Sequence, residues 1–116
     1  MTQSKAPYEQ GDVVLVRFVY ADGTGAKRRP AIILSTGTYH QSRQEAIIAA
    51  ITSNVQHLLV GDHLIEGWQQ AGLIYPSVAT GIIRTVKQAM IERQLGEMPV
   101  ADMQAIRDQM RHILGL

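Results

Sequence analysis

The chain has 116 residues, which suits one small domain with a modest hydrophobic core. Its apolar fraction of 46% is typical of a folded protein, and its net charge of +1 points to no particular partner. The absence of cysteine excludes disulfides, thiol nucleophiles and zinc–thiolate sites. We expect a flexible polar tail over residues 1–10 and a single domain over residues 11–116. The tail lacks the apolar segment of a secretory signal, and no apolar run could span a bilayer, so we expect a cytoplasmic protein.

The first half of the domain carries the pattern of short β-strands. Three β-forming apolar runs, each bounded by turn residues, predict strands over residues 13–20, 30–35 and 46–52. The segments between them predict a mobile loop over residues 21–28, which contains two glycines, and a polar turn over residues 36–44.

The second half is less regular until its last segment. Residues 65–72, around Trp68, predict one or two helical turns ended by a glycine. Two further short strands are predicted over residues 75–79 and 82–86, separated by Thr80-Gly81. The last segment predicts a helix that begins near Pro99, because apolar residues recur at three- and four-residue spacing: Val100, Met103, Ile106, Met110, Ile113 and Leu114. Short strands followed by one helix favour a small β-barrel or coiled sheet.

The residue types that bind metals show no ligand spacing. Neither HExxH nor an EF-hand loop is present, and the four histidines are scattered, so we expect each to be a surface residue: His40, His57, His63 and His112. The sequence therefore predicts neither a metal nor another cofactor.

Positive charge is concentrated in the first half of the domain. Between residues 17 and 43 only Asp22 opposes five cations, which are Arg17, Lys27, Arg28, Arg29 and Arg43. Such a patch attracts phosphate, although a solvated basic loop would have the same composition.

Two residues within this half could act on a phosphate. Arg29 precedes a proline, which favours an extended backbone, and its guanidinium can form paired hydrogen bonds to phosphate oxygens. Thr52 ends an apolar run on the same side as Ile48 and Ala50, so its hydroxyl lies where a buried face reaches the rim. A surface salt bridge for the arginine, and a bond from local backbone to the threonine, remain open alternatives.

The order of several short segments resembles that of the MazF/PemK toxins. The similar segments are Gly11-Asp12-Val13-Val14-Leu15-Val16, Arg28-Arg29-Pro30-Ala31-Ile32-Ile33-Leu34, Ala49-Ala50-Ile51-Thr52-Ser53, Gly72-Leu73, Pro76-Ser77-Val78, Ile83-Arg84-Thr85-Val86 and Leu95-Gly96-Glu97-Met98. The resemblance implies a mainly β fold, an SH3-like small β-barrel with a C-terminal helix, and commonly a homodimer. It also implies metal-independent cleavage of single-stranded RNA and neutralisation by an antitoxin protein, for which we expect an acidic segment.

The same resemblance assigns roles to residues. It makes Arg29 and Thr52 catalytic, with Ser53 assisting, and we expect Lys27, Arg28 and Arg17 to contact RNA. Many relatives carry an acidic or amide residue where this chain has Arg28, so that arginine could compete with Arg29 for the phosphate.

Two alternative functions remain on the same barrel. One is a binding module without catalysis, or a relative that poisons a topoisomerase as CcdB-type toxins do. The other is a nucleic-acid-binding barrel that uses only the basic patch, for which one Phe, one Trp and four Tyr offer little aromatic stacking surface. Trp68 and the methionines of the last helix are expected in the core or in a dimer contact.

Overall fold

The computed structural model describes residues 7–19 and 21–116. The first six residues of the predicted tail lie outside the described residues, as does Tyr20, the end of the first predicted strand. In chain order the elements are β1 (Asp12–Val19), β2 (Ala26–Ile33), α1 (Gly37–Ser42), β3 (Glu45–Thr52), β4 (His63–Leu64), β5 (Val78–Lys87), the short 3-10 helix η1 (Gln88–Met90), β6 (Ile91–Glu97) and α2 (Val100–Leu114).

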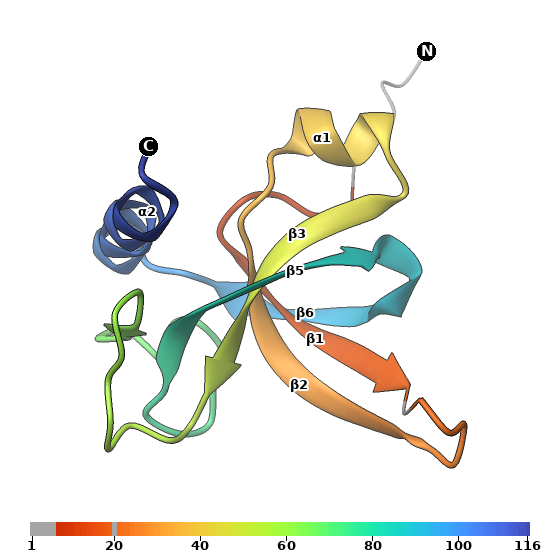
Figure 1. The fold of residues 1–116 in the computed structure, drawn as a ribbon, viewed down its shortest axis with the longest axis horizontal. Helices are drawn as coiled ribbons and strands as arrows, with labels where there is room; N and C mark the ends of the chain where they lie inside the picture. The colour runs from red at the N-terminus through yellow and green to blue at the C-terminus, as the bar shows by residue number, and fades with distance from the viewer. Residues whose placement is uncertain (1–6, 20) are drawn as a thin grey trace.

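The strands form one antiparallel sheet in the order β4-β5-β3-β2-β1-β6. The sheet is strongly twisted and coils on itself (Figure 1), and Ile91 of the edge strand β6 packs in the same cluster as Val86 of β5. Within the described part of the chain the edge strands β4 and β6 do not pair with each other. The predicted fold class, a small barrel-like β-structure with a C-terminal helix, is confirmed.

Both faces of the sheet are covered at its centre. On one face, Val13, Ile32 and Ala49 pack in a cluster with Met103 and Ile106 of α2. On the other face a second cluster is enclosed by the coiling sheet, and it contains Val14, Val16, Ala31, Ile33, Ala46, Ile48, Val86 and Ile91. Burial on both faces explains why the strand sequences are uniformly apolar rather than alternating.

Several element boundaries differ from the prediction because of tertiary pairing. The strand β2 begins at Ala26, not after residue 28, since Lys27 pairs with Phe18 and continues the ladder with β1. The predicted turn over residues 36–44 contains α1, whose first turn is capped by the side chain of Thr36. The prediction of two strands over 75–79 and 82–86 was wrong, because β5 is continuous. At its irregular point Thr80 Oγ1 donates to the Ala50 carbonyl (2.8 Å) and accepts from the Ile82 amide (3.1 Å).

The helical turns predicted over residues 65–72 are a non-helical tight turn. One bond of helical type joins the Ala71 amide to the Gly67 carbonyl (3.0 Å), and the chain then reverses at Gly72, whose φ is +82°. A Cβ at Gly72 would stand 2.0 Å from the Leu95 carbonyl oxygen, so β6 packs directly on this turn. The strands β4 and β6 were not predicted, whereas the helix α2 was predicted and is confirmed.

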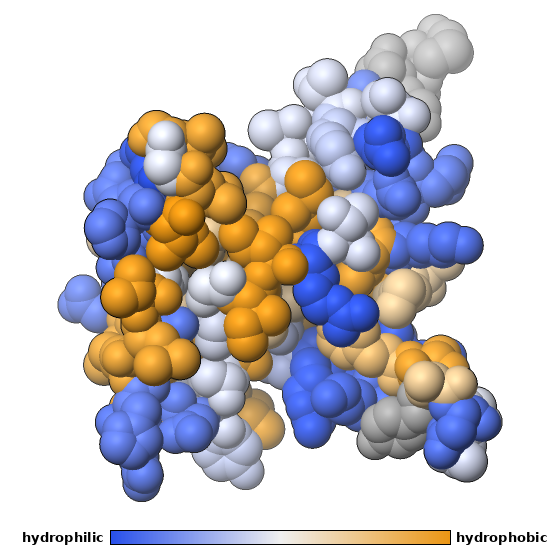
Figure 2. Space-filling view, viewed as in Figure 1, coloured by the Kyte–Doolittle hydropathy of each residue, from blue (hydrophilic) through white to orange (hydrophobic). Residues whose placement is uncertain are grey.

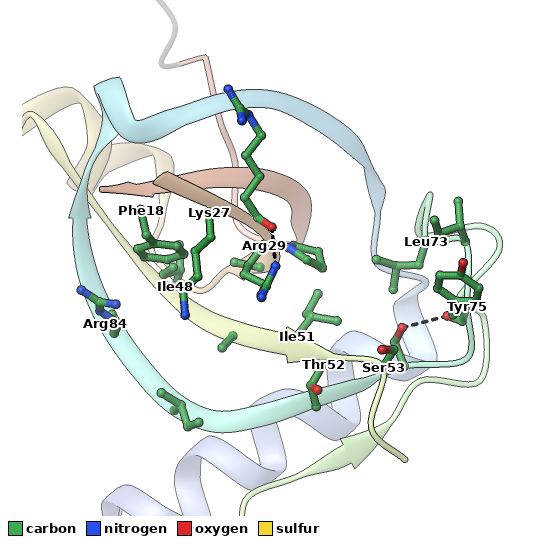
Figure 3. Close-up of a pocket in the computed structure, with 17 residues that line it drawn as sticks. Phe18, Lys27, Arg29, Ile48, Ile51, Thr52, Ser53, Leu73, Tyr75 and Arg84 are labelled. Atoms are coloured by element: carbon green, nitrogen blue, oxygen red, sulfur yellow. Dashed lines mark hydrogen bonds between the residues drawn. The ribbon is translucent and has the colours of Figure 1, made fainter. Parts of the chain in front are cut away.

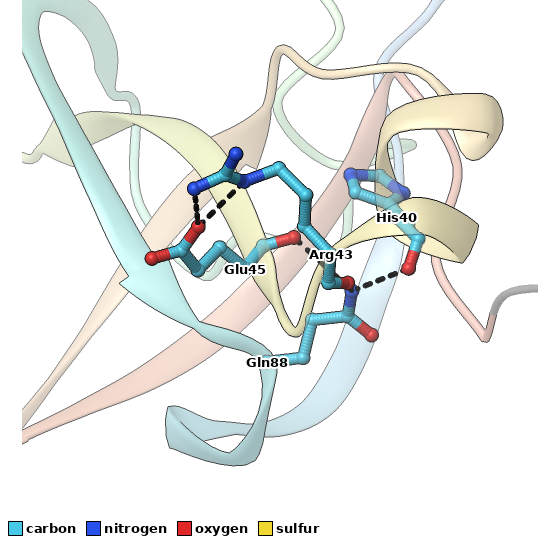
Figure 4. Close-up of polar contacts among 4 residues, drawn as sticks. All are labelled: His40, Arg43, Glu45 and Gln88. Atoms are coloured by element: carbon cyan, nitrogen blue, oxygen red, sulfur yellow. Dashed lines mark hydrogen bonds and ion pairs between the residues drawn. The ribbon is translucent and has the colours of Figure 1, made fainter.

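The short helix α1 is held by buried polar groups. His40, expected at the surface, is only 5% exposed, because its ring bonds Ser35 Oγ and the Tyr8 carbonyl, at 2.5 and 2.9 Å. The Gln88 amide nitrogen lies 3.0–3.1 Å from the carbonyl oxygens of His40, Arg43 and Glu45 (Figure 4). These bonds tie α1 to the end of β5 and to the first described residues.

A second buried polar group joins α2 to the sheet edge. Asp102 is 3% exposed and accepts hydrogen bonds from His63 Nε2 (2.7 Å) and from the amides of Glu66 and Gly67 (2.8 and 2.9 Å). His63 is therefore a structural partner of α2 rather than a surface residue. His57 and His112 are exposed, as expected. Among the described residues, no helix has the length and apolar character needed to cross a membrane.

Candidate active site

A pocket of about 640 Å³ opens where β2 and β3 diverge. The ladder between these strands pairs Ile33 with Ile48 and Ala31 with Ala50, and it ends there. If the ladder continued in the same register for two more residues, Arg29 would lie opposite Thr52. Both residues line the pocket instead, one on each of the diverging strands (Figure 3). The structure therefore brings together the two residues predicted to be catalytic.

The Arg29 guanidinium is held by backbone and not by a carboxylate. Its side chain is exposed, and its Nη1 donates to the Arg28 carbonyl at 3.1 Å. In the described part of the chain no carboxylate lies within ion-pair distance of Arg29, so the alternative of a surface salt bridge is not realised there. Arg29 lines the pocket, and its remaining N–H groups are available to an anion.

Thr52 is half-buried. Its hydroxyl can accept a bond from the local backbone and still donate one to a phosphate, which were the two roles considered from the sequence. Its oxygen accepts a bond from the Asn54 amide at 3.2 Å, which is the local backbone contact considered above. That bond fixes the oxygen but leaves the hydroxyl proton free, and the described residues offer no acceptor for it. Ser53 follows on the exposed rim and also lines the pocket.

The pocket is positively charged. Lys27, Arg28, Arg29 and Arg84 line it, and no described Asp or Glu side chain does. Hydroxyl groups of Thr52, Ser53, Tyr75 and Ser77 also line it, and Ser77 Oγ donates to the Tyr75 carbonyl at 2.8 Å. Arg28 is paired with Glu92, and the other three cations, together with the hydroxyls, are suited to binding a phosphate.

Of the other two predicted RNA contacts, Arg28 also lines the pocket and Arg17 does not. Arg28 Nε donates to Glu92 on β6 at 2.7 Å, and this hydrogen bond holds the pKa of the Glu92 carboxyl below its usual range. The Arg28 guanidinium is thus already paired, which argues against its predicted competition with Arg29. Arg17 pairs with Arg28 across β1 and β2, and it does not line the pocket. RNA binding by Arg17 and Arg28 remains a prediction, made less favourable by the pairing of Arg28 with Glu92 and by the position of Arg17 outside the pocket lining.

Phe18 and Arg84 line the pocket and were not singled out in the sequence. The Arg84 guanidinium carbon lies 4.8 Å from the centre of the Phe18 ring. The available signal was a lone arginine within the apolar run of β5, but only the ladder with Ile48 shows that it shares a face with the pocket. Among the described residues, no three His, Asp or Glu side chains are grouped so as to hold a metal ion.

The chain matches, over residues 9–114, the family of PemK-like, MazF-like toxins of type II toxin–antitoxin systems, and it belongs to this family. Solved structures with the same fold include an endoribonuclease in complex with its cognate antitoxin from a mycobacterial species (TM-score 0.73, 19% identity, 94% of this chain and 96% of that one). They also include MazE–MazF from Deinococcus radiodurans (0.72, 20%, 94% and 96%) and the Mycobacterium tuberculosis toxin MazF-mt6 (0.73, 21%, 90% and 97%). No curated protein matches the chain in sequence.

Proposed function

We propose that this toxin is a metal-independent endoribonuclease that cleaves single-stranded RNA, mRNA in particular, and is neutralised by a cognate antitoxin. The observation that carries the proposal is the position of Arg29 and Thr52 on diverging strands around one cationic pocket. A ribonuclease acting on mRNA would work in the cytoplasm. Solved structures of similar fold are described as an endoribonuclease and as toxin–antitoxin complexes, which supports this choice.

The proposed reaction uses the RNA's own nucleophile. The 2′-oxygen forms a bond to the adjacent phosphorus while the bond from phosphorus to the next 5′-oxygen breaks, which leaves a 2′,3′-cyclic phosphate and a 5′-hydroxyl. Negative charge increases on the non-bridging oxygens during this step. Arg29 and the Thr52 hydroxyl would donate hydrogen bonds to that charge, which is an effective use of fixed donors.

Proton transfer in this mechanism does not use a carboxylate or an imidazole of the pocket. The 2′-hydroxyl loses a proton and the leaving oxygen gains one, yet no described carboxylate or imidazole lines the pocket. Arginine is a poor acid because it stays protonated. We therefore assign both transfers to water, and we expect the cleavage rate to increase with pH through the neutral range without a bell-shaped profile.

The antitoxin is proposed to act on the same charges. An acidic, partly disordered segment laid over Lys27 and Arg29 would supply the carboxylates that the pocket lacks. RNA and antitoxin would then exclude each other, because both neutralise the same cations.

A homodimer is also part of the proposal. The helix α2 and the middle of β3 and β5 present an apolar face (Figure 2), with a hollow lined by residues that include Leu34, Ile47, Ile83, Met110 and Leu114. A second copy of the chain would cover this face. We expect Leu114→Arg to give a monomer in light scattering, whereas Gln104→Arg, an exposed position of the same helix, should leave the dimer intact.

The deciding experiment is cleavage of a long single-stranded RNA in excess EDTA by the purified chain. Arg29→Ala and Thr52→Ala should both cleave at least about tenfold more slowly than the parent, and mass spectrometry of the parent's products should find cyclic phosphate ends. Equal cleavage by all three proteins would indicate another site or a contaminating nuclease. No cleavage by the parent would favour the binding module or the topoisomerase-directed toxin.

A further inference from the structure

The pocket has a second cationic end, separate from Arg29 and Thr52. Figure 3 shows Phe18, Lys27 and Arg84 gathered at one end, Leu73 and Tyr75 at the other, and Arg29 with Thr52 between them. Phe18 and Lys27 are direct cross-strand partners, so their side chains lie on the same face. The site therefore extends well beyond the space of one phosphate.

The strand register keeps Arg84 away from Arg29. Arg84 is opposite Ile48 on β3, whereas Arg29 is level with Thr52 by the register of β2 and β3. The two guanidiniums share a face but lie at different places along the pocket, Arg84 at the end with Phe18 and Lys27, and Arg29 nearer to Thr52 (Figure 3).

The Arg84 side chain is oriented by an aromatic ring and not by a carboxylate. Its guanidinium stacks on Phe18, with 4.8 Å between the guanidinium carbon and the ring centre. Stacking fixes the plane of the guanidinium and leaves its N–H donors at the edge free. Over the described residues, neither Arg84 nor Lys27 forms an ion pair, so both charges are available to a ligand.

We propose that Arg84, stacked on Phe18, and Lys27 bind a second backbone phosphate of the RNA, one linkage or more away from the phosphate at Arg29 and Thr52. This inference rests on the proposed ribonuclease function. Arg84 is then a residue that binds and positions the substrate strand, and Phe18 acts through it.

The test combines protein variants with RNAs in which single phosphates are neutral. The probe is a short fluorescent RNA that spans a mapped cleavage site, with a 2′-O-methyl group at the attacking nucleotide to prevent cleavage. A series of such RNAs carries one methylphosphonate each, moved linkage by linkage. Binding is measured by anisotropy for the parent, Arg84→Gln and Lys87→Gln. The last is the matched control, because Lys87 is on the same strand but on its opposite face.

We expect Arg84→Gln to weaken binding roughly 5- to 20-fold and to lower the salt dependence by about 0.7 in the slope of log K against log salt. One methylphosphonate position away from the scissile linkage should weaken the parent and Lys87→Gln but not Arg84→Gln. In cleavage assays Arg84→Gln should raise KM with kcat nearly unchanged, Arg84→Lys should recover part of the loss, and Phe18→Leu should show a smaller rise in KM. Thermal unfolding of each variant checks that the fold is intact.

Three results would overturn the inference. If every methylphosphonate penalty is the same in Arg84→Gln as in the parent, Arg84 contacts no phosphate. If Arg84→Gln lowers kcat at constant KM, the residue acts on the reacting phosphate instead. If the parent neither binds nor cleaves RNA, the proposed function fails and this inference fails with it, whereas the first two results leave the ribonuclease intact.

Discussion

Two regions of this molecule differ in whether their charged side chains have partners within the protein. At the edge of the sheet the buried carboxylate of Asp102 accepts from His63 and from two backbone amides, so its hydrogen-bonding capacity is met inside the protein. In the pocket, Lys27, Arg29 and Arg84 face a common space that no described carboxylate lines. The hydrogen bonds of Asp102 therefore connect α2 to the turn before β5.

The difference separates groups that stabilise the fold from groups available to a ligand. A buried charge without partners is strongly unfavourable, so Asp102 must be paired for the chain to fold. Cations at an open pocket stay solvated and need no partner, so their convergence without carboxylates is not required by stability. Variants in the two regions should therefore affect different measurements.

The largest expected effect is in the pocket. Arg29→Ala should reduce the RNA cleavage rate by about 10²–10³, corresponding to roughly 2.7–4 kcal/mol of barrier, because a donor to the developing charge is lost. The urea midpoint of unfolding should hardly change, since Arg29 is exposed and bonds only its neighbour's carbonyl in the described structure. Gel-based cleavage and urea titrations on the same preparation measure both quantities.

The control for Arg29→Ala is Lys87→Ala, which removes one positive charge from the opposite face of β5. It should leave the cleavage rate within about twofold, because removal of a distant surface charge changes little at ordinary salt. Equal losses in the two variants would mean that net charge, and not the pocket, determines activity.

The second effect concerns stability and arises at Asp102. Asp102→Asn should lower the free energy of unfolding by about 2–3 kcal/mol, because an amide group then faces buried donors that the carboxylate accepted. Cleavage per folded molecule should be unchanged. Asp108→Asn, on an exposed position of the same helix, provides the control and should have little effect on the urea midpoint.

The same site predicts a direction for the pH dependence of stability. Burial raises the pKa of Asp102, but the hydrogen bonds from His63, Glu66 and Gly67 outweigh it and hold the pKa below its ordinary value of 3.8. The contribution of Asp102 is therefore complete above about pH 4 and is lost as pH falls through the lower folded pKa. Parent and Asp102→Asn should become more alike in stability below pH 4; a constant difference down to pH 2 would contradict this.

The sequence predicted the fold class and the central pair of the site because both depend on local pattern. The run Ala46–Thr52 reads as a strand from composition alone, and Arg29 and Thr52 stand in the segments that resemble the family. Their convergence, however, depends on the register of β2 with β3, which short apolar strands do not specify in advance.

What sequence reasoning missed depends on contacts distant along the chain. The partners of two histidines could not be predicted, because they are not their neighbours in sequence. His63 is held by Asp102, and His40 is held by Ser35 and Tyr8. Arg84 looked like an ordinary strand residue until β3 placed it on the face of the pocket. The strand β6 has a polar sequence from Glu92 to Gln94 and is defined mainly by pairing with β1.

A moderate effect should follow from removing the other central donor. Thr52→Val keeps the shape of the side chain but loses the hydroxyl, and we expect cleavage to slow roughly tenfold, about 1.5 kcal/mol, with KM little changed. Thr52→Ser should keep most activity because the hydroxyl remains. If valine is as active as the parent, Thr52 only caps the turn through the Asn54 amide, and the hydroxyl has no part in the reaction.

The smallest effect tests whether Arg28, the pocket cation that is already paired, contributes to RNA cleavage. Glu92→Gln removes the partner of Arg28 while every residue that lines the pocket is kept, and exposed pairs of this kind contribute little. RNA cleavage and its salt dependence should stay within about twofold of the parent. If instead the released Arg28 steepens the salt dependence, then Arg28 and its neighbour Arg17 lie on the path of the RNA, as the sequence predicted. In that case the unpaired cations and the paired Arg28 would both bind RNA and would differ only in strength. Glu92 would then limit an RNA contact instead of completing a surface ion pair.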